Sequence, residues 1–380
     1  MIVERYLDWA SSAPAHMRAE AAGALARSYL HGELDAHVRE EVEAALTLAL
    51  DDDHVAVRAA LADALAASPD APPALILSLA QDVPDVADPV LSRSPVLGDL
   101  ELVDLVALGG SRAQLAISGR RQVSGPLAAA IAEVGDARAC ERLASNRGAH
   151  LTRAAASRIA ERHGADGATR DALLTREELG PEIRQRLMRS VAEALSAFVS
   201  SRGWLDAGRA RRAADEACER GLVVIASDAP DRRAFVLHLA ERDLFSPSLA
   251  LRALLSGDLA LFEAALSALS GQDPVRVAGF VRDFEGRGFE ALYQRAGFPR
   301  SALGAFRGAL AAAREVGFAE MGSAALSRRM VERALTACEG ADLDVSSLRA
   351  MLRRLAAEAA REDARRTLGE PARRVAAAAA

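Results

Sequence analysis

Polar and arginine side chains interrupt an otherwise apolar helical stretch in the segment QLAISGRRQV, residues 114–123. Arg120 and Arg121 carry guanidinium groups, whose planar fork of donors binds carboxylates and phosphates through paired hydrogen bonds. Because arginine stays protonated at physiological pH, it cannot act as a general base. The chemistry that this segment indicates is therefore recognition of an anion, not acid–base catalysis.

Three consecutive blocks of 26 residues, 83–108, 109–134 and 135–160, align without gaps. Each block predicts a short helix, a break of a few residues and a second helix, and apolar residues recur in register, as at Leu91 and Ile117. Self-similarity of this kind is typical of a repeat array, in which each helix pair buries its apolar face against its neighbours.

The polar interruption belongs to this repeat. The register places Ser94, Arg120 and Asn146 at one equivalent position in the three blocks. One hypothesis is a binding strip, because in many solenoids such a layer lines the concave surface. The alternative is that these side chains only satisfy backbone groups where helices end. The residues predicted to bind a partner under the first hypothesis are Arg93, Ser94, Arg120, Arg121, Asn146 and Arg147.

Glycine and proline positions predict where the helices of the blocks begin. Gly109 and Gly135 open successive blocks, where a tight turn would need a positive φ. Asp88 and Pro89 are the residue types favoured at a helix N-cap and in its first turn, so a helix is predicted to begin there.

The composition predicts an all-α protein. The chain of 380 residues is 51% hydrophobic but only 4% aromatic, it is rich in alanine, and β-branched runs are rare. We expect a right-handed α-solenoid of HEAT-like helix pairs followed by a more irregular helical region. The expected organisation is HEAT-like helical repeats over 1–165, a C-terminal helical domain that continues the array over 166–340, and a terminal helix with a flexible tail over 341–380.

Past residue 165 the 26-residue register is lost while the helical pattern continues. Thr175 and Glu178 have capping-box spacing ahead of a helix that begins near Pro181. An apolar stripe over 187–198 predicts a buried face of that helix. The phenylalanines and tyrosine that cluster over 280–306 predict a compact core, with a partner-docking patch as the alternative.

A further helix is predicted past residue 340. Leu348, Leu352 and Leu355 share one side of it. We expect this helix either to dock back on the body of the protein or to pair with a partner, which includes a homodimer formed through it.

Several kinds of chemistry are excluded by the residues that are missing. All 47 basic residues are arginine, so Schiff-base and phosphate-loop mechanisms that need lysine are impossible. The net charge of −6 argues against a general nucleic-acid binder. The seven histidines show no metal-ligand spacing, and helix capping explains the acidic run DDDH at 51–54. No catalytic, cofactor or metal site is predicted.

The cysteines and the N-terminus predict the cellular setting. Three cysteines, at 140, 218 and 338, are odd in number and far apart, so neither a disulfide framework nor a CxxC site is indicated. The N-terminal segment MIVERYLDWASS lacks the apolar core of a secretory signal, and no stretch reaches the ~18 consecutive apolar residues of a membrane span. A soluble protein of a reducing cytoplasm is expected.

Several separated blocks are similar, in the same order, to one family of bacterial proteins. The blocks are DVADPVLSRSPVLGDLELVDLV, AQLAISGRRQVS, ERLASNRGAHL, ELGPEIRQRLMRSVAEAL and LLSGDLALFEAALSALSGQDPVRVAGFVRD. They resemble the alphaproteobacterial family called domain of unknown function 2336, over roughly residues 20–315. The family more often has an alanine-isoleucine-alanine-arginine run where this chain has Ser118 and Gly119 before Arg120. The resemblance implies a HEAT-like or leucine-rich-repeat-variant helical protein of the bacterial cytoplasm, and no activity.

Two functions follow as hypotheses. The first is a non-enzymatic helical-repeat scaffold, of a kind suited to regulation, that binds an acidic segment of a protein partner through its arginine-lined layer. The second is a HEAT-like nucleic-acid-binding protein or DNA glycosylase, which would place arginines on phosphates and aromatic side chains around an exposed base.

Overall fold

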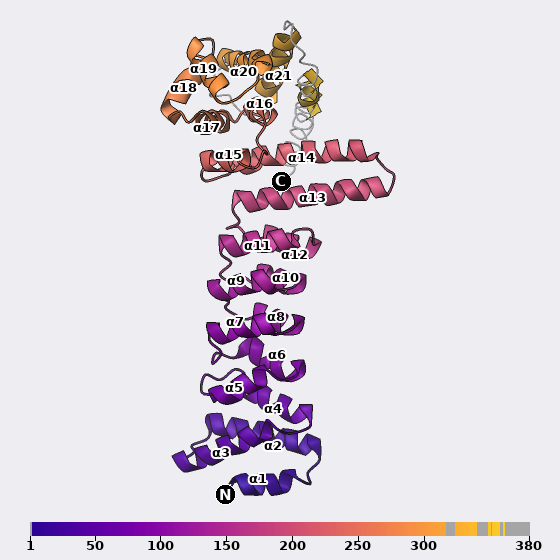
Figure 1. The fold of residues 1–380 in the computed structure, drawn as a ribbon, viewed down its shortest axis with the longest axis vertical. Helices are drawn as coiled ribbons and strands as arrows, with labels where there is room; N and C mark the ends of the chain where they lie inside the picture. Colours follow the sequence, from indigo (N-terminus) through magenta and orange to yellow (C-terminus); the bar gives the residue numbers. More distant parts are fainter. Residues whose placement is uncertain (1, 317–323, 340–348, 351, 358–359, 362–380) are drawn as a thin grey trace, which may run out of the picture. The chain divides into compact units, whose positions relative to one another are not determined.

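The protein is helical throughout the part that the structure describes (Figure 1). The computed structural model describes residues 2–316, 324–339, 349–350, 352–357 and 360–361. Within these ranges there is no β-strand, and one isolated parallel bridge joins Val123 to Ala149. The all-α prediction is therefore confirmed. Contacts divide the chain into two units, 1–190 and 191–380. The predicted boundaries at 165 and 340 stay predictions.

The first unit consists mainly of short helices joined by short turns. Their bounds are α1 (Ile2–Ala10), α2 (Ala15–His31), α3 (Ala36–Ala49), α4 (Val55–Leu65), α5 (Pro73–Ala80), α6 (Pro84–Arg93), α7 (Asp99–Leu108), α8 (Ser111–Ser118), α9 (Gly125–Val134), α10 (Ala137–Ser145), α11 (Arg153–His163), α12 (Gly167–Leu174) and α13 (Pro181–Ser201), which runs on into the second unit.

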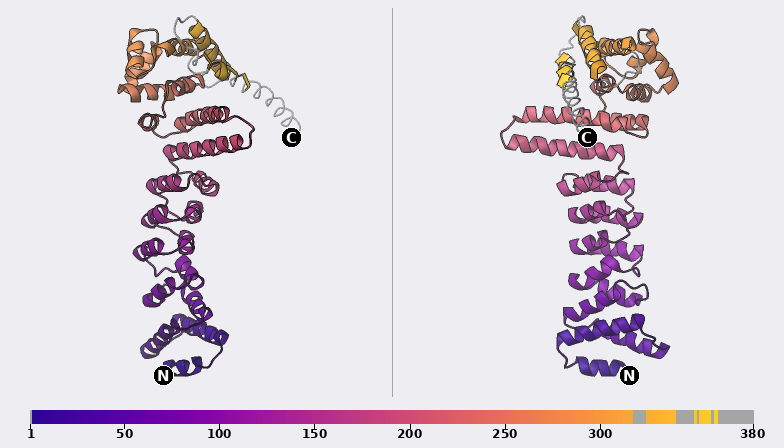
Figure 2. Two further views of the ribbon diagram at one scale, coloured as in Figure 1. Left: turned by 45° about the vertical axis from the view of Figure 1, so that its right-hand side comes forward. Right: turned by 180° about the vertical axis from the view of Figure 1, so that it is seen from behind.

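Helices of the first unit contact alternate neighbours in the chain. The even-numbered helices from α2 to α12 each pack against the next even-numbered one, and α7, α9 and α11 pack in the same way. Two rows result, which can be followed in Figure 2. Each predicted block holds one helix of either row, and α9 begins at Gly125, which is 26 residues after α7 begins at Asp99.

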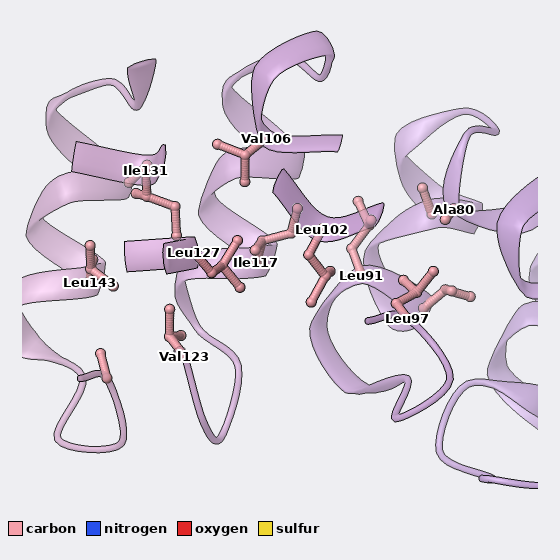
Figure 3. Packing of buried hydrophobic residues seen from close by; sticks show 14 of the residues in the cluster. Ala80, Leu91, Leu97, Leu102, Val106, Ile117, Val123, Leu127, Ile131 and Leu143 are labelled. Carbon is pink, nitrogen blue, oxygen red and sulfur yellow. The ribbon is translucent and has the colours of Figure 1, made fainter. Parts of the chain in front are cut away.

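The core of this unit runs between the rows. Leu91, Ile117 and Leu143, which the repeat register placed at one position, are 0–1% exposed. Figure 3 shows them among buried residues of neighbouring helices, such as Leu102 and Ile131. Burying each such side chain contributes about 1.5–3 kcal/mol. Because helices of 8–11 residues are marginal in isolation, this packing is what keeps them folded.

The prediction of positive φ at Gly109 and Gly135 is wrong. Their φ angles are −77° and −61°, in the extended region. Each glycine N–H donates to the carbonyl four residues earlier, in Leu105 and Ile131, and an added Cβ would lie 2.4 or 2.5 Å from that same oxygen. Glycine is therefore explained by close approach to a helix end rather than by a left-handed backbone.

The helix start predicted at Asp88 and Pro89 is also wrong. Helix α6 begins at Pro84, which occupies the first helical position, and Pro89 lies inside the helix. Proline suits the first position because no hydrogen bond is lost there. The Asp88 carboxylate accepts from Nε of Arg112, so it serves an ion pair between helices.

Arginine–carboxylate pairs join each helix pair to the next. Arg18 binds Asp52 through two hydrogen bonds of 2.8 and 2.9 Å, and Arg58 binds Asp82 through two of 2.6 and 2.9 Å. These four side chains are only 11–20% exposed, and charge-assisted bidentate pairs are the stronger kind. Asp52 of the DDDH run also accepts from the backbone N–H of His54. More exposed pairs are Arg112 with Asp85 and Asp88, Arg158 with Glu133, and Arg186 with Glu161.

The second unit has a core of its own. Its further helices are α14 (Ala207–Ser227), α15 (Arg232–Ala240), α16 (Pro247–Leu255), α17 (Leu259–Ser270), α18 (Pro274–Arg282), α19 (Arg287–Arg295), the 3₁₀ turn η1 (Arg300–Ala302), α20 (Leu303–Val316) and α21 (Ala324–Glu339). The predicted aromatic core is confirmed, since all but the half-buried Phe280 are 0–6% exposed: Phe284, Phe289, Tyr293, Phe298 and Phe306.

Predictions around α13 are confirmed in part. The helix begins at Pro181 as expected, but Thr175 ends α12 instead of opening a capping box. Leu187 is buried, whereas Leu195 and Phe198 on the same stripe are 59% and 46% exposed. The hydrogen bonds and ion pairs that join α13 to α11 and to the turn after it come from the first half of α13, at Glu182, Arg186 and Ser190.

The C-terminal helix docks on the second unit where it is described. Leu352 and Leu355 are buried in the same cluster as Phe306. Leu348 and residues 362–380, which include the predicted tail, lie outside the described residues. The homodimer through this helix stays a prediction.

We expect the first unit to lose stability as the pH falls below about 4. Hydrogen bonds from Arg18 and Arg58 hold the pKa values of Asp52 and Asp82 below their usual range. Because these folded pKa values lie below the unfolded ones, the stabilisation is present above pH ~4 and is lost as the pH falls through the folded pKa. Urea unfolding followed by circular dichroism between pH 7 and pH 3 measures the loss.

Asp82→Asn separates this pair from the general effect of acid. The variant should lose about 1–2 kcal/mol at neutral pH and then show a shallower dependence on acid than the wild type. Asp63→Asn, whose carboxylate is 66% exposed, is the control and should follow the wild type. Equal pH slopes for Asp82→Asn and the wild type would rule out this role of Asp82.

Candidate functional site

Arg120 reaches back from the end of α8 to the end of α6. Its two terminal nitrogens donate to the carbonyl oxygens of Leu91 and Ser94, at 2.7 and 2.6 Å. These carbonyls lie in the last turn and at the C-cap of α6, where no intrahelical donor is available. Burial lowers the pKa of Arg120, yet arginine stays charged because its ordinary pKa is so high. The guanidinium thus bridges two consecutive helix pairs.

Asn146 makes the equivalent contact one repeat further on. Its amide nitrogen donates to the carbonyls of Ser118 and Arg120, at 3.0 and 2.7 Å, and its amide oxygen accepts from the N–H of Gly148. A neutral side chain therefore does here what Arg120 does in the block before. For these two residues, the structure shows the alternative that polar groups of the repeat satisfy the backbone at helix ends.

The remaining residues at the end of α6 differ in exposure. Ser94 is fully buried, and its hydroxyl accepts from the N–H of Val96. Arg93 is half exposed and donates to Asp63 on α4 at 2.7 Å. Ser94 therefore supports the turn, while Arg93 lies at the surface in a pair that solvent screens.

Arg176 makes a third contact of the kind made by Arg120 and Asn146, and this contact was not predicted. It donates to the carbonyls of Asn146 and Ala149, both at 2.9 Å, and its side chain is only 9% exposed. It lies 30 residues after Asn146, so the 26-residue register does not reach it. The sequence signal was only an arginine beyond the end of α12.

Arg121 and Arg147 are the two residues of the predicted set with side chains open to solvent and no hydrogen bond or ion pair within the described part of the chain. They come from adjacent turns that are held together. The N–H of Val123 donates to Gly148 and the N–H of His150 donates to Val123. A Cβ on Gly148 would lie 1.9 Å from the carbonyl oxygen of Arg121, so the turns approach as closely as only glycine allows.

A cavity of about 500 Å³ opens elsewhere in the first unit, among α5, α6, α7 and α8. Its lining includes apolar residues of α6, such as Ala87 and Leu91, and carboxylates on α7, at Glu101 and Asp104. None of the six predicted residues lines it. Sequence periodicity placed α7 within the repeat, so this cavity was not predicted.

The thiol of Cys140 is a further reactive group of the first unit. Burial raises the pKa of the Cys140 thiol to about 11, so it is protonated at neutral pH and a poor nucleophile. Within the described residues, no three histidine, cysteine or acidic side chains are grouped as metal ligands. No helix of that part is both long and apolar enough to cross a membrane.

These features define a class: an all-helical protein whose first unit repeats a helix pair and joins successive pairs by hydrogen bonds from arginine and asparagine. Residues 86–344 match the family described as "Uncharacterised protein conserved in bacteria (DUF2336)", and since the match covers more than half of the chain, the protein belongs to this family. The resemblance seen in the sequence blocks is thereby confirmed. No curated protein and no solved structure matches the chain.

We expect Arg120→Met to destabilise the first unit by about 2–3 kcal/mol, because two helix-end carbonyls lose a charged donor. Arg121→Met changes the neighbouring, exposed side chain in the same way and should stay within about 0.5 kcal/mol of the wild type. Urea unfolding of both variants at neutral pH provides the comparison. Equal stabilities of the two variants would show that the bridge from Arg120 contributes nothing.

Proposed function

We propose that the protein is a non-enzymatic interaction scaffold, whose first unit is an α-solenoid that binds an acidic segment of a protein partner. The observation that carries the proposal is the pair of exposed guanidinium groups, Arg121 and Arg147, on two turns locked to each other. Carboxylates fit the donor fork of arginine in a bidentate geometry. An extended acidic segment has such carboxylates at short intervals.

The contact pattern of the first unit supports the solenoid. Each even-numbered helix from α2 to α12 contacts the next in its row, and the helix pairs repeat in the sequence. In repeat proteins of this type each pair contacts only its neighbours, so turns at one edge recur at regular intervals and form a continuous surface. Recurring turns place recurring side chains, which suits binding to an extended chain.

Bridges beneath the exposed arginines support the binding role. Arg120 fixes its turn to α6, and Asn146 fixes the next turn to Arg120 and Ser118. The turns that carry Arg121 and Arg147 are thus held before any partner binds, and rigid donors lose less entropy on binding. Arg120 and Asn146 act by positioning, and the direct contacts are assigned to the exposed pair.

Arg93 extends the same surface toward α4. Its pair with Asp63 is 50% and 66% exposed on the two sides, and such pairs contribute only about 0–1 kcal/mol. A carboxylate from a partner can replace Asp63 at little cost. Binding by exchange of ion pairs would also be sensitive to salt.

The free thiol of the buried Cys140 supports a cytoplasmic setting, where cysteines stay reduced. The partner is then another cytoplasmic protein. The alternative ligand is nucleic acid, since phosphates accept from arginine as carboxylates do, but the net charge of −6 disfavours it.

The test is binding of a fluorescent peptide of alternating glutamate and serine, followed by anisotropy at low and at high salt. We expect Arg121→Glu combined with Arg147→Glu to weaken binding about tenfold or more, because two attractive contacts become repulsive. Arg211→Glu combined with Arg212→Glu makes the same change in charge on the exposed face of α14 and should leave the affinity unchanged.

Two results would contradict the proposal. Equal affinities of the two double variants for the acidic peptide would show that the turns are not its site. Tighter binding of a DNA duplex than of the acidic peptide, lost in the same Arg121 and Arg147 variant, would instead assign the surface to nucleic acid.

A further inference from the structure

The row of odd-numbered helices in the first unit is interrupted between α5 and α7. Helix α7 packs against α9, and α9 against α11, but α5 packs against α4 and α6 and makes no comparable contact with α7 among the described residues. The cavity of about 500 Å³ lies at this interruption. Pockets of this volume are large enough to take several side chains of a ligand.

Comparison of α7 with α9, its equivalent in the next repeat, shows which face is left open. In α9, which has a row neighbour on either side, Leu127 and Ile131 are 1% and 0% exposed. The residues 26 positions earlier in α7 are Glu101, which is exposed, and Leu105, which is half-buried, and both line the cavity. The face that α9 buries is therefore open in α7 and carries a carboxylate where α9 has a leucine.

The open face combines apolar and acidic groups at helical spacing. Glu101, Asp104, Leu105 and Leu108 follow one another at intervals of three, one and three residues and lie on one side of α7. Leu108 is 89% exposed, which is unusual for a leucine at a cavity. Glu101 and Asp104 make no ion pair within the described part of the chain.

Ion pairs already hold the carboxylates on the opposite side of the cavity. Asp82 is bound by Arg58, and one oxygen of Asp88 accepts from Nε of Arg112, whose terminal Nη2 donates to Asp85. The second oxygen of Asp88 is buried without a hydrogen-bond donor. The unbalanced charge at the cavity is therefore negative, and a donor is lacking at Asp88.

We propose that this cavity is a docking groove for a cationic amphipathic helix of a partner protein, which lies in the gap of the row between α5 and α7. Apolar side chains of that helix would fill the cavity above Ala87 and Leu91 and cover Leu108, while its arginines or lysines pair with Glu101 and Asp104. An amphipathic helix is the occupant that matches a missing helix neighbour. The groove lies apart from the arginine turns and is proposed independently of them.

The probe is a labelled peptide of about 15 residues, long enough to hold a helix, with leucines on one face and arginines on the other. An acidic counterpart keeps the leucines and replaces every arginine by glutamate. We expect the cationic peptide to bind the full-length protein at least about tenfold more tightly than the acidic one at low salt, and less tightly as salt is raised.

Matched variants of α7 test the groove itself. Leu108→Gln should weaken binding of the cationic peptide about tenfold, whereas Leu100→Gln should not, since Leu100 is 82% exposed on the same helix but does not line the cavity. Glu101→Arg combined with Asp104→Arg should weaken it about tenfold or more. The control with the same charge change is Glu20→Arg combined with Asp70→Arg, at exposed positions away from the cavity.

Circular dichroism should show the same helix content in all these variants, because the changed side chains are exposed. Equal affinities of Leu108→Gln and Leu100→Gln, or equal binding of the two peptides, would overturn the groove. The Arg121 and Arg147 double variant should bind the cationic peptide as the wild type does. Failure of the acidic-peptide test above would leave this result in place, so the two proposals fail separately.

Discussion

The first unit depends on side chains that donate hydrogen bonds to backbone carbonyl groups of the preceding helix pair. Its helices are mostly too short to be stable alone, and their ends expose carbonyl groups that need donors. Arg120, Asn146 and Arg176 supply these donors across successive turns. Ion pairs of Arg18 with Asp52 and of Arg58 with Asp82 add further links in the same unit. Arginine suits the task because one guanidinium reaches two acceptors at once.

These bridges also explain which polar side chains at the helix ends are buried and which are exposed. A guanidinium that is half-buried on two carbonyls, as in Arg120, is no longer free for a partner, whereas the next residue along the chain points to solvent. Neighbouring arginines thus have opposite roles, one fixing the turn and one presented by it. Because Arg120 fixes the turn, it also determines the position of the exposed arginine that follows it. The exposed surface is therefore as rigid as the helix packing that supports it.

Much of the helical organisation could be predicted from the sequence, because apolar periodicity reports directly on which face is buried. The block boundaries around Leu91 and Ile117 match observed helix pairs for this reason. Local sequence signals, such as capping residues, predicted the structure less accurately where tertiary contacts compete with them. Asp88 has the residue type of a cap but pairs with Arg112, and the stripe beyond Leu187 is exposed although its spacing is that of a buried face.

The groove could not be predicted, because it results from a contact that is missing. A repeat register assumes that equivalent helices have equivalent neighbours, and α7 breaks this rule on the side of α5 only. The trace of it in the sequence is Glu101, a charge at the position where the next repeat has the buried Leu127. Burying an unpaired carboxylate is costly, so this glutamate is itself a physical reason for the row to stay open there. The cationic helix proposed for the gap would neutralise the same charge, so under that proposal one residue would both prevent self-packing and favour the partner.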